Sequence, residues 1–134
     1  MKKRYFTLQE AQNLIPEISI KLKKLIRIVK TINFLQNFEI SYEDEFQLIY
    51  NEINSRKNTH KLYYEFYEML EDVLNYGAIV KDLNFGLVDF YSLHEGKEIF
   101  LCWQLGENNI RYWHEANSNY DERKPIELLN KKLL

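Results

Sequence analysis

The repeat of the hydrophobic pattern changes once along the chain, at Gly77. Before Gly77, apolar residues recur every third or fourth position, as in Ile18, Leu22, Leu25, Val29 and Ile32. After it, short runs such as "AIVKD" and "EIFLCWQL" alternate with a period near two. Helices repeat about every 3.6 residues and strands about every two, so the pattern predicts an α+β protein. We expect an antiparallel, coiled-coil-like helical hairpin over residues 1–76, followed by a small antiparallel β-sheet of three or four strands over residues 77–116.

The first helix has a start signal and an internal break. The segment "TLQE" fits a capping box, in which the Thr7 hydroxyl accepts from the Glu10 amide and the Glu10 carboxylate accepts from the Thr7 amide. Pro16 interrupts the helical pattern, because proline removes a backbone donor and crowds the preceding turn. We expect a short helix to about Asn13 or Ile15, with Pro16 near the first position of a longer helix or at a kink.

The second helix is expected to begin at Ser41, which would cap it, with Asp44 three residues further on. It would end at the "NYG" of residues 75–77. The two helices would then span about 20 and about 33 residues. Their unequal lengths would leave apolar surface uncovered. The polar face of the first helix carries cations and no acid, and we interpret it as a solvated face paired with acids of the second helix: Lys21, Lys23, Lys24, Arg27 and Lys30.

Glu95-Gly96 lies between two alternating runs and is typical of a tight hairpin turn. With a two-residue turn, counting back predicts three cross-strand pairs, Val88–Trp103, Asp89–Cys102 and Phe90–Leu101. One face would then hold Val88, Phe90, Ile99, Leu101 and Trp103, and the other Asp89, Tyr91, Phe100, Cys102 and Gln104. We expect structural roles for Trp103, Trp113, Phe90 and Gly86.

Composition and charge exclude several classes of protein. With 134 residues of which 46% are hydrophobic, the chain can bury a core as a single domain. A formal charge of −2 argues against nucleic acid and anionic membranes as partners, because binding to phosphate needs an excess of Lys and Arg. No apolar run is long enough for a signal peptide or a membrane helix. One cysteine fits a reducing compartment, so we expect a cytoplasmic protein. The tail, residues 117–134, is expected to add a short helix after Pro125.

Four motifs in order give the chain a resemblance to a known family. They are "YFTLQEAQNLIP", "VKDLNFGLVDF", "LCWQLGE" and "YWHE", at residues 5–16, 80–90, 101–107 and 112–115. They resemble the bacterial and archaeal proteins of domain of unknown function 2203. The resemblance implies a small stand-alone protein with a helical hairpin and a β-rich C-terminal part, and it implies no established activity. Relatives tend to have a turn with Gly and Arg after the WHE motif. This chain has "ANSNYDERKP" there, so no role is carried over to Arg123 or to residues 117–125.

The predicted strands gather residue types that bind metals. Zinc and iron sites need three or four N, O or S ligands that converge at about 2.0–2.3 Å. Because adjacent strand residues point to opposite faces, His114 and Glu115 would share a metal only at a bulge or a strand end. We interpret His60, alone on a helix, as a solvated or hydrogen-bonded residue. The candidate ligands for a divalent metal are Asp89, His114, Glu115, Glu107 and Cys102, with His94 and Glu98 on neighbouring strands or turns.

Two of these candidates have alternative roles. Cys102 as a nucleophile would need a neighbouring base, whereas its place in "IFLCWQL" is ordinary for a small buried hydrophobe. Asp89 lies between Val88 and Phe90, so it must face water or be paired inside. It is therefore a structural salt bridge or indole–carboxylate bond, a general acid or base, or part of a small ligand pocket. Its candidate partners are Arg111, His114, Trp103 and Trp113.

The expected function is that of an interaction or scaffolding module which self-associates through its helices as a homo-oligomer, in the simplest case a dimer. Exposed apolar surface usually marks partners, and ten tyrosines with two tryptophans supply contact groups of the kind enriched at interfaces. Nothing in the sequence demands a cofactor. The alternative is a small metal- or ligand-binding protein, or a hydrolase-like enzyme, with a site around Asp89, His114 and Glu115.

Overall fold

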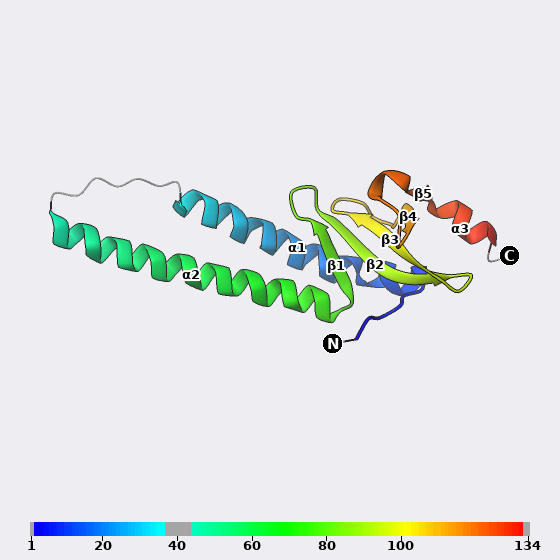
Figure 1. The fold of residues 1–134 in the computed structure, drawn as a ribbon, viewed down its shortest axis with the longest axis horizontal. Coiled ribbons are helices and arrows are strands. Elements are labelled where there is room, and N and C mark those ends of the chain that lie inside the picture. Colours follow the sequence, from blue (N-terminus) through cyan, green and yellow to red (C-terminus); the bar gives the residue numbers. More distant parts are fainter. Residues whose placement is uncertain (1, 37–43, 133–134) are drawn as a thin grey trace.

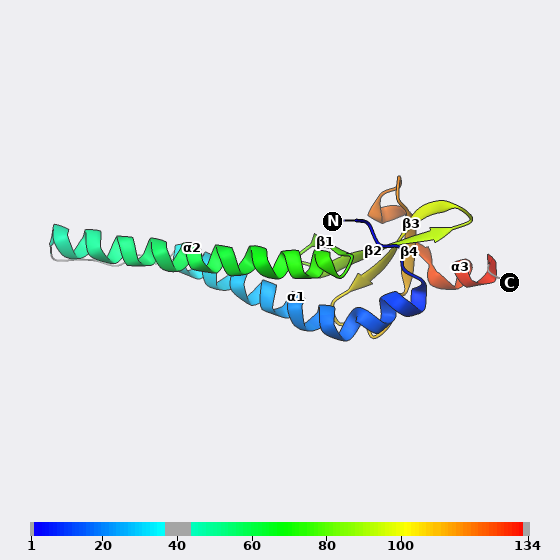
Figure 2. The same ribbon diagram turned by 90° about the horizontal axis from the view of Figure 1, so that it is seen from below.

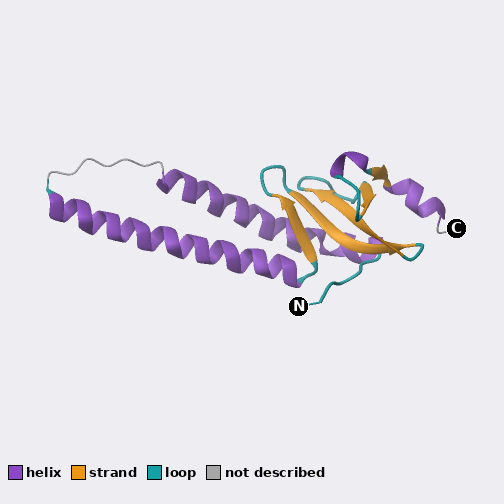
Figure 3. Cartoon of the chain, viewed as in Figure 1, coloured by secondary structure: helices purple, strands orange, loops and turns teal. Residues whose placement is uncertain are grey.

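The computed structural model describes residues 2–36 and 44–132. Two long helices run side by side as an arm, and a twisted antiparallel sheet lies at one end of it (Figure 1, Figure 3). The class is therefore α+β with a helical hairpin, as predicted. Within the described ranges, no helix combines the length and the apolarity that a membrane span requires. The elements are α1 (Leu8–Gln36), α2 (Glu45–Asn75), β1 (Ala78–Asp82), β2 (Leu87–His94), β3 (Lys97–Gln104), β4 (Tyr112–Glu115), the 3₁₀ turn η1 (Tyr120–Glu122), β5 (Lys124–Pro125) and α3 (Ile126–Lys132).

α1 is one continuous helix of 29 residues with Pro16 inside it. The predicted short helix ending near Asn13 or Ile15 is therefore wrong. A proline costs one backbone hydrogen bond and bends a helix without having to end it, and Figure 2 shows the N-terminal part of α1 turning out of line with the arm. The predicted capping box is present. The Glu10 amide donates to Thr7 Oγ1 at 3.1 Å, and the Thr7 amide donates to Glu10 Oε1 at 3.0 Å.

α2 begins at Glu45 with Asp44 as its N-cap, whose Oδ1 accepts from the Gln47 amide at 2.7 Å. Ser41, the predicted cap, lies outside the described residues. The helices have 29 and 31 residues. The expected length of about 20 is therefore wrong for α1, whereas about 33 is close for α2, and unequal length does not leave apolar surface on the arm. One cation of α1 does pair with an acid of α2, because Lys21 Nζ lies 3.6 Å from Asp72 Oδ2.

The sheet has the strand order β1-β2-β3-β4-β5, and every neighbouring pair is antiparallel. The turn between β2 and β3 has the two predicted residues, so the predicted register holds: Val88 pairs with Trp103, Asp89 with Cys102 and Phe90 with Leu101. The expectation of three or four strands misses β5. Two residues are too few to show an alternating pattern, and β5 exists only through its pairing with β4.

One face of the sheet packs on α1 and forms the core. Figure 2 shows α1 passing along this face. The buried strand residues on it are Ala78, Val88, Phe90, Ile99, Leu101, Trp103 and Trp113. They form one cluster with the α1 residues Ala11, Ile15, Ile18, Leu22 and Leu25. The opposite face of the sheet, which carries every second residue of each strand, is left uncovered by both long helices.

The segment before α1 lies along β2 just beyond the pair that Phe90 makes with Ala78, the first residue of β1. The Phe6 amide donates to the Tyr91 carbonyl at 2.8 Å. Glu98 of β3 holds the same segment, since it accepts from the Tyr5 hydroxyl and from Lys3 Nζ, the latter at 3.2 Å. The chain entering α1 is thus fastened across two strands of the sheet.

Replacing Gly86 by alanine tests the fold at the turn between β1 and β2. Gly86 has φ +67°, and a Cβ there would lie 2.7 Å from Leu105 Cβ. Gly96 has a similar φ of +76°, with nothing within 4 Å of its Cβ position, and is the matched control. We expect Gly96→Ala to lower the free energy of unfolding by about 1 kcal/mol through backbone strain. Gly86→Ala should lower it by roughly 1–3 kcal/mol more, through overpacking. Urea unfolding measures both, and equal losses would contradict the assigned contact.

The pKa of Glu98 should report the contacts that attach the segment before α1 to the sheet. Its pKa is lowered, first by the hydrogen bond from Tyr5 and then by that from Lys3. A carboxyl with a depressed folded-state pKa stabilises the fold above its unfolded pKa, and that stability is lost as the pH falls through the folded value. We expect Tyr5→Phe to raise the pKa of Glu98, measured by carboxyl carbon NMR. The pKa of Glu10, lowered by its bonds to Thr7, should not move. An unchanged Glu98 pKa would argue against this fastening.

Candidate functional site

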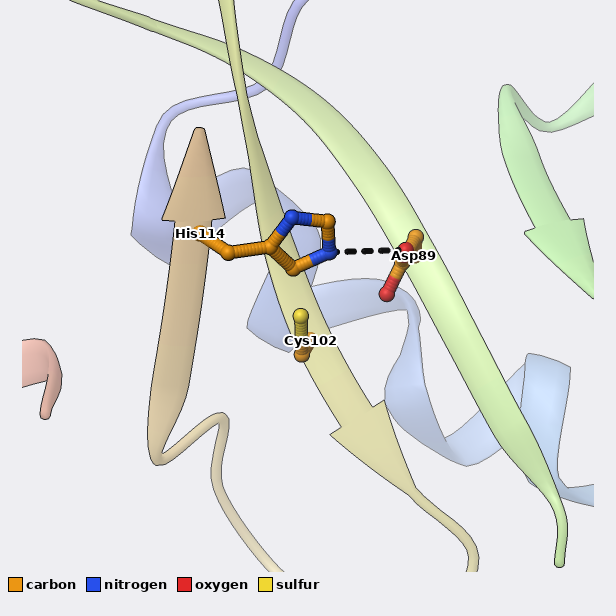
Figure 4. Close-up of side chains that lie close together, drawn as sticks. All are labelled: Asp89, Cys102 and His114. Carbon is orange, nitrogen blue, oxygen red and sulfur yellow. Dashed lines mark hydrogen bonds and ion pairs between the residues drawn. The ribbon is translucent and has the colours of Figure 1, made fainter. Parts of the chain in front are cut away.

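The outer face of the sheet, turned away from α1, carries a cluster of three chemically active side chains from three adjacent strands. Asp89 comes from β2, Cys102 from β3 and His114 from β4 (Figure 4). Asp89 pairs directly with Cys102, whereas His114 pairs with Phe100, two residues before Cys102 on the same face. The register of β2 on β3 and that of β4 on β3 therefore bring the three residues together. The three are not close to one another in the sequence.

The three side chains converge in a buried place. Asp89, Cys102 and His114 are only 4%, 4% and 5% exposed, although they lie on the face that the long helices leave uncovered. A carboxylate oxygen, the thiol sulfur and a ring nitrogen all lie within 4.8 Å of one another. His114 Nε2 is 3.4 Å from Asp89 Oδ2. That separation is long for a charge-assisted hydrogen bond, which is usually about 2.7–2.9 Å.

The second ring nitrogen of His114 determines what faces Asp89. Nδ1 lies 2.9 Å from the backbone carbonyl oxygen of Glu115. A carbonyl oxygen only accepts, so Nδ1 carries the hydrogen and donates it. In the neutral ring, Nε2 then presents a lone pair to the carboxylate of Asp89, which is also an acceptor. Two acceptors that face each other in a buried site require a proton or a cation between them.

Electrostatics argue against Cys102 as a nucleophile. Burial raises the pKa of the Cys102 thiol, and the neighbouring Asp89 carboxylate raises it further. Reactive cysteines have depressed pKa values in electropositive, partly exposed surroundings. Burial also raises the pKa of Asp89, against the opposing effects of Cys102, His114 and Lys81, in that order. A buried acid with a perturbed pKa and specific charged neighbours is typical of a functional site.

The remaining predicted ligands lie apart from this cluster. The side chain of Glu115 is half-exposed, with Oε1 3.6 Å from Lys124 Nζ. Glu107 lies in the connection between β3 and β4, where its Oε1 accepts from the Gln104 amide at 2.8 Å. His94 is buried at the far end of β2, with its ring 5.8 Å from that of Trp113. Of the residues named around Asp89, only Cys102 and His114 are brought to it.

The predicted alternative in which a tryptophan indole N–H donates to the Asp89 carboxylate is wrong. The Trp103 indole N–H donates to the Glu107 carbonyl at 2.8 Å, and the Trp113 indole N–H donates to the Pro125 carbonyl at 3.2 Å. Arg111, another proposed partner, lies 3.8 Å from a Glu107 carboxylate oxygen. Both tryptophans belong to the core face, as expected, so their rings and the Asp89 carboxylate are on opposite sides of the sheet.

Two cationic side chains, Lys81 and Arg123, flank the cluster, and neither was among the candidate site residues predicted from the sequence. Lys81 Nζ lies 4.7 Å from the centre of the Phe100 ring, and the Arg123 guanidinium lies 4.6 Å from that of Tyr112. Both lower the pKa of Cys102, against its burial. The contact with Phe100, which lies on the same face as Cys102, places Lys81 of β1 on the face of the cluster. The alternation of "AIVKD" indicates a strand in which Ile79 and Lys81 share a face. The pairing of this strand with β2 could not be predicted, because the register shifts between Val80 and Asp82.

These features define an α+β protein with a long helical arm and a buried cluster of mixed donors on the outer face of its sheet. Residues 4–126 match the family described as "Uncharacterized conserved protein (DUF2203)". The chain belongs to this family, as its motifs predicted. The matched residues include all three members of the cluster. No curated protein matches the chain, and no solved structure matches it.

Proposed function

We propose that the protein binds one divalent transition-metal ion, zinc or a close relative, through Asp89, Cys102 and His114. The observation that carries the proposal is the pair of acceptors, His114 Nε2 and Asp89 Oδ2, that face each other across 3.4 Å beside a buried thiol. Ligand bonds of about 2.0–2.3 Å in a tetrahedral zinc site separate neighbouring ligand atoms by about 3.3–3.6 Å. The spacing of the two acceptors fits a shared cation better than it fits a direct hydrogen bond.

The chemistry of the donor set supports the same assignment. A thiolate, an imidazole and a carboxylate are the three protein ligand types that zinc uses. The hydrogen bond from His114 Nδ1 to the Glu115 carbonyl is the outer contact that orients metal-binding histidines and leaves Nε2 free to coordinate. A bound cation would also stabilise the Cys102 thiolate, which burial alone disfavours. Three protein ligands leave a fourth position for water or an exogenous ligand.

Metal titration tests the proposal directly. Protein purified without a histidine tag and treated with a chelator should bind one Zn²⁺ or Co²⁺ per chain. The cobalt form should show thiolate-to-metal charge-transfer absorption, which disappears in Cys102→Ser. Zinc at about 100 times its dissociation constant should add about 2.7 kcal/mol to the free energy of unfolding.

Matched variants separate the ligands from their neighbours. His114→Ala and Asp89→Asn should weaken binding at least tenfold, because each removes one ligand. Glu115→Gln should bind normally, because its side chain points to Lys124 and its backbone carbonyl is retained. Circular dichroism of each variant checks that it folds. A folded wild-type protein that binds no metal, or a cobalt spectrum without the thiolate band, would overturn the assignment.

We infer, as a second function, that the chain self-associates through its helical arm as a homodimer. The supporting observation is the number of large apolar side chains that α2 leaves at least a third exposed: Phe46, Leu48, Ile49, Tyr50, Ile53, Tyr63, Tyr64, Tyr67 and Leu74. Apolar patches of this extent usually mark partner surfaces, and two-fold dimers are the commonest outcome. Sedimentation velocity over a micromolar concentration series should show reversible association. A strict monomer throughout the series would contradict it.

A further inference from the structure

α2 carries two stripes of residues at heptad spacing. The inner stripe includes Phe66, Met69 and Val73, which pack in the core cluster. Residues two positions apart on a helix lie about 200° apart around its axis, so a second stripe shifted by two positions points away from α1. This outer stripe consists of Phe46, Tyr50, Ile53, Lys57, His60, Tyr64, Tyr67, Glu71 and Leu74, in alternating steps of four and three.

Six of the nine residues in the outer stripe are aromatic or aliphatic, and they are open to solvent. Its six aromatic and aliphatic members are between 44% and 80% exposed. In the described part of the chain, Figure 1 shows α1 on only one side of α2 along the arm. A helix with apolar residues on a single face needs one partner. α2 has apolar residues on two opposite faces. The outer face is therefore suited to a second helix, and none from residues 2–36 or 44–132 of the same chain covers it.

The charges of α2 indicate which helix fits there. Residues 56–61 contain Arg56, Lys57 and Lys61 together with His60, and no acid. Residues 65–72 contain Glu65, Glu68, Glu71 and Asp72, and no base. An antiparallel copy of α2 would place the basic segment of each chain against the acidic segment of the other. A parallel copy would place like charges together, which is unfavourable.

We propose that the outer stripes of two copies of this chain pair in antiparallel orientation, with the two-fold axis near Leu62. The proposal rests on the self-association proposed above and names its surface and its direction. In this pairing Lys57 lies over the ring of the partner's Tyr67, and Ile53 lies beside the partner's Glu71. A half-exposed side chain of this size offers about 100 Å². Five such side chains in each copy would bury about 1,000 Å², the lower bound for a specific interface.

Paired substitutions locate the surface. Tyr64→Ser with Tyr67→Ser should weaken dimerisation at least tenfold in sedimentation equilibrium, because both rings leave the centre of the interface. Ile20→Ser with Phe85→Ser is the control, since these residues are 58% and 67% exposed and lie outside the stripe. Equal weakening by both pairs would overturn the assignment of the outer stripe, as would a wild-type chain that is monomeric at every concentration.

Cysteine cross-linking tests the direction separately. Cys102 is only 4% exposed, so introduced cysteines provide the reactive thiols. A short bis-maleimide should link Ile53→Cys to Glu71→Cys when the two variants are mixed, and neither variant to itself. Linking of Ile53→Cys with itself would indicate parallel helices and overturn the proposal, even where dimerisation is present. A dimer in which none of these combinations links would overturn it as well, because the stripes would then not be in contact.

Discussion

The two-residue turn at Glu95-Gly96 is the constraint on which the rest of the sheet depends. It sets the register of β2 on β3, and register decides which side chains face α1. A slip of one residue would send Val88 and Phe90 outward and bring Asp89 into the core. With the observed register, the face that packs on α1 is mostly apolar, and the opposite face holds Asp89, Cys102 and His114. The core face of the sheet and the pairing of Asp89 with Cys102 are two results of the same turn.

The burial of three polar side chains on the outer face needs a physical explanation, and the proposed metal ion would provide one. Asp89, Cys102 and His114 lie on the side without long helices and are nevertheless buried, among Phe100, Tyr112 and the flanking cations of Lys81 and Arg123. A buried ion pair is costly unless its geometry is excellent, and the 3.4 Å between His114 Nε2 and Asp89 Oδ2 is long for such a pair. A cation held by all three groups would compensate for the burial of each. The arm and the cluster lie in different parts of the molecule, so metal binding and dimerisation can be tested independently.

Local signals predicted much of this structure. The change of period at Gly77, the capping box at Thr7 and the hairpin register all involve residues close in sequence. The errors arose where tertiary context decides. Pro16 lies within α1 because packing on the sheet offsets one lost hydrogen bond. The site was predicted only in part for a related reason. The pairing of Asp89 with Cys102 followed from a short turn, whereas that of β4 with β3 depends on the longer connection over residues 105–111, whose conformation no simple pattern specifies.

The proposed metal site places one cation between Asp89, Cys102 and His114. X-ray absorption at the zinc edge of the zinc-loaded protein tests it most directly, because sulfur scatters differently from nitrogen and oxygen. We expect one sulfur at about 2.3 Å, with the remaining nitrogen and oxygen ligands at about 2.0–2.2 Å, one of them carrying the outer-shell scattering of an imidazole ring. A first shell of nitrogen and oxygen alone would contradict it, because the metal would then be bound elsewhere on the chain.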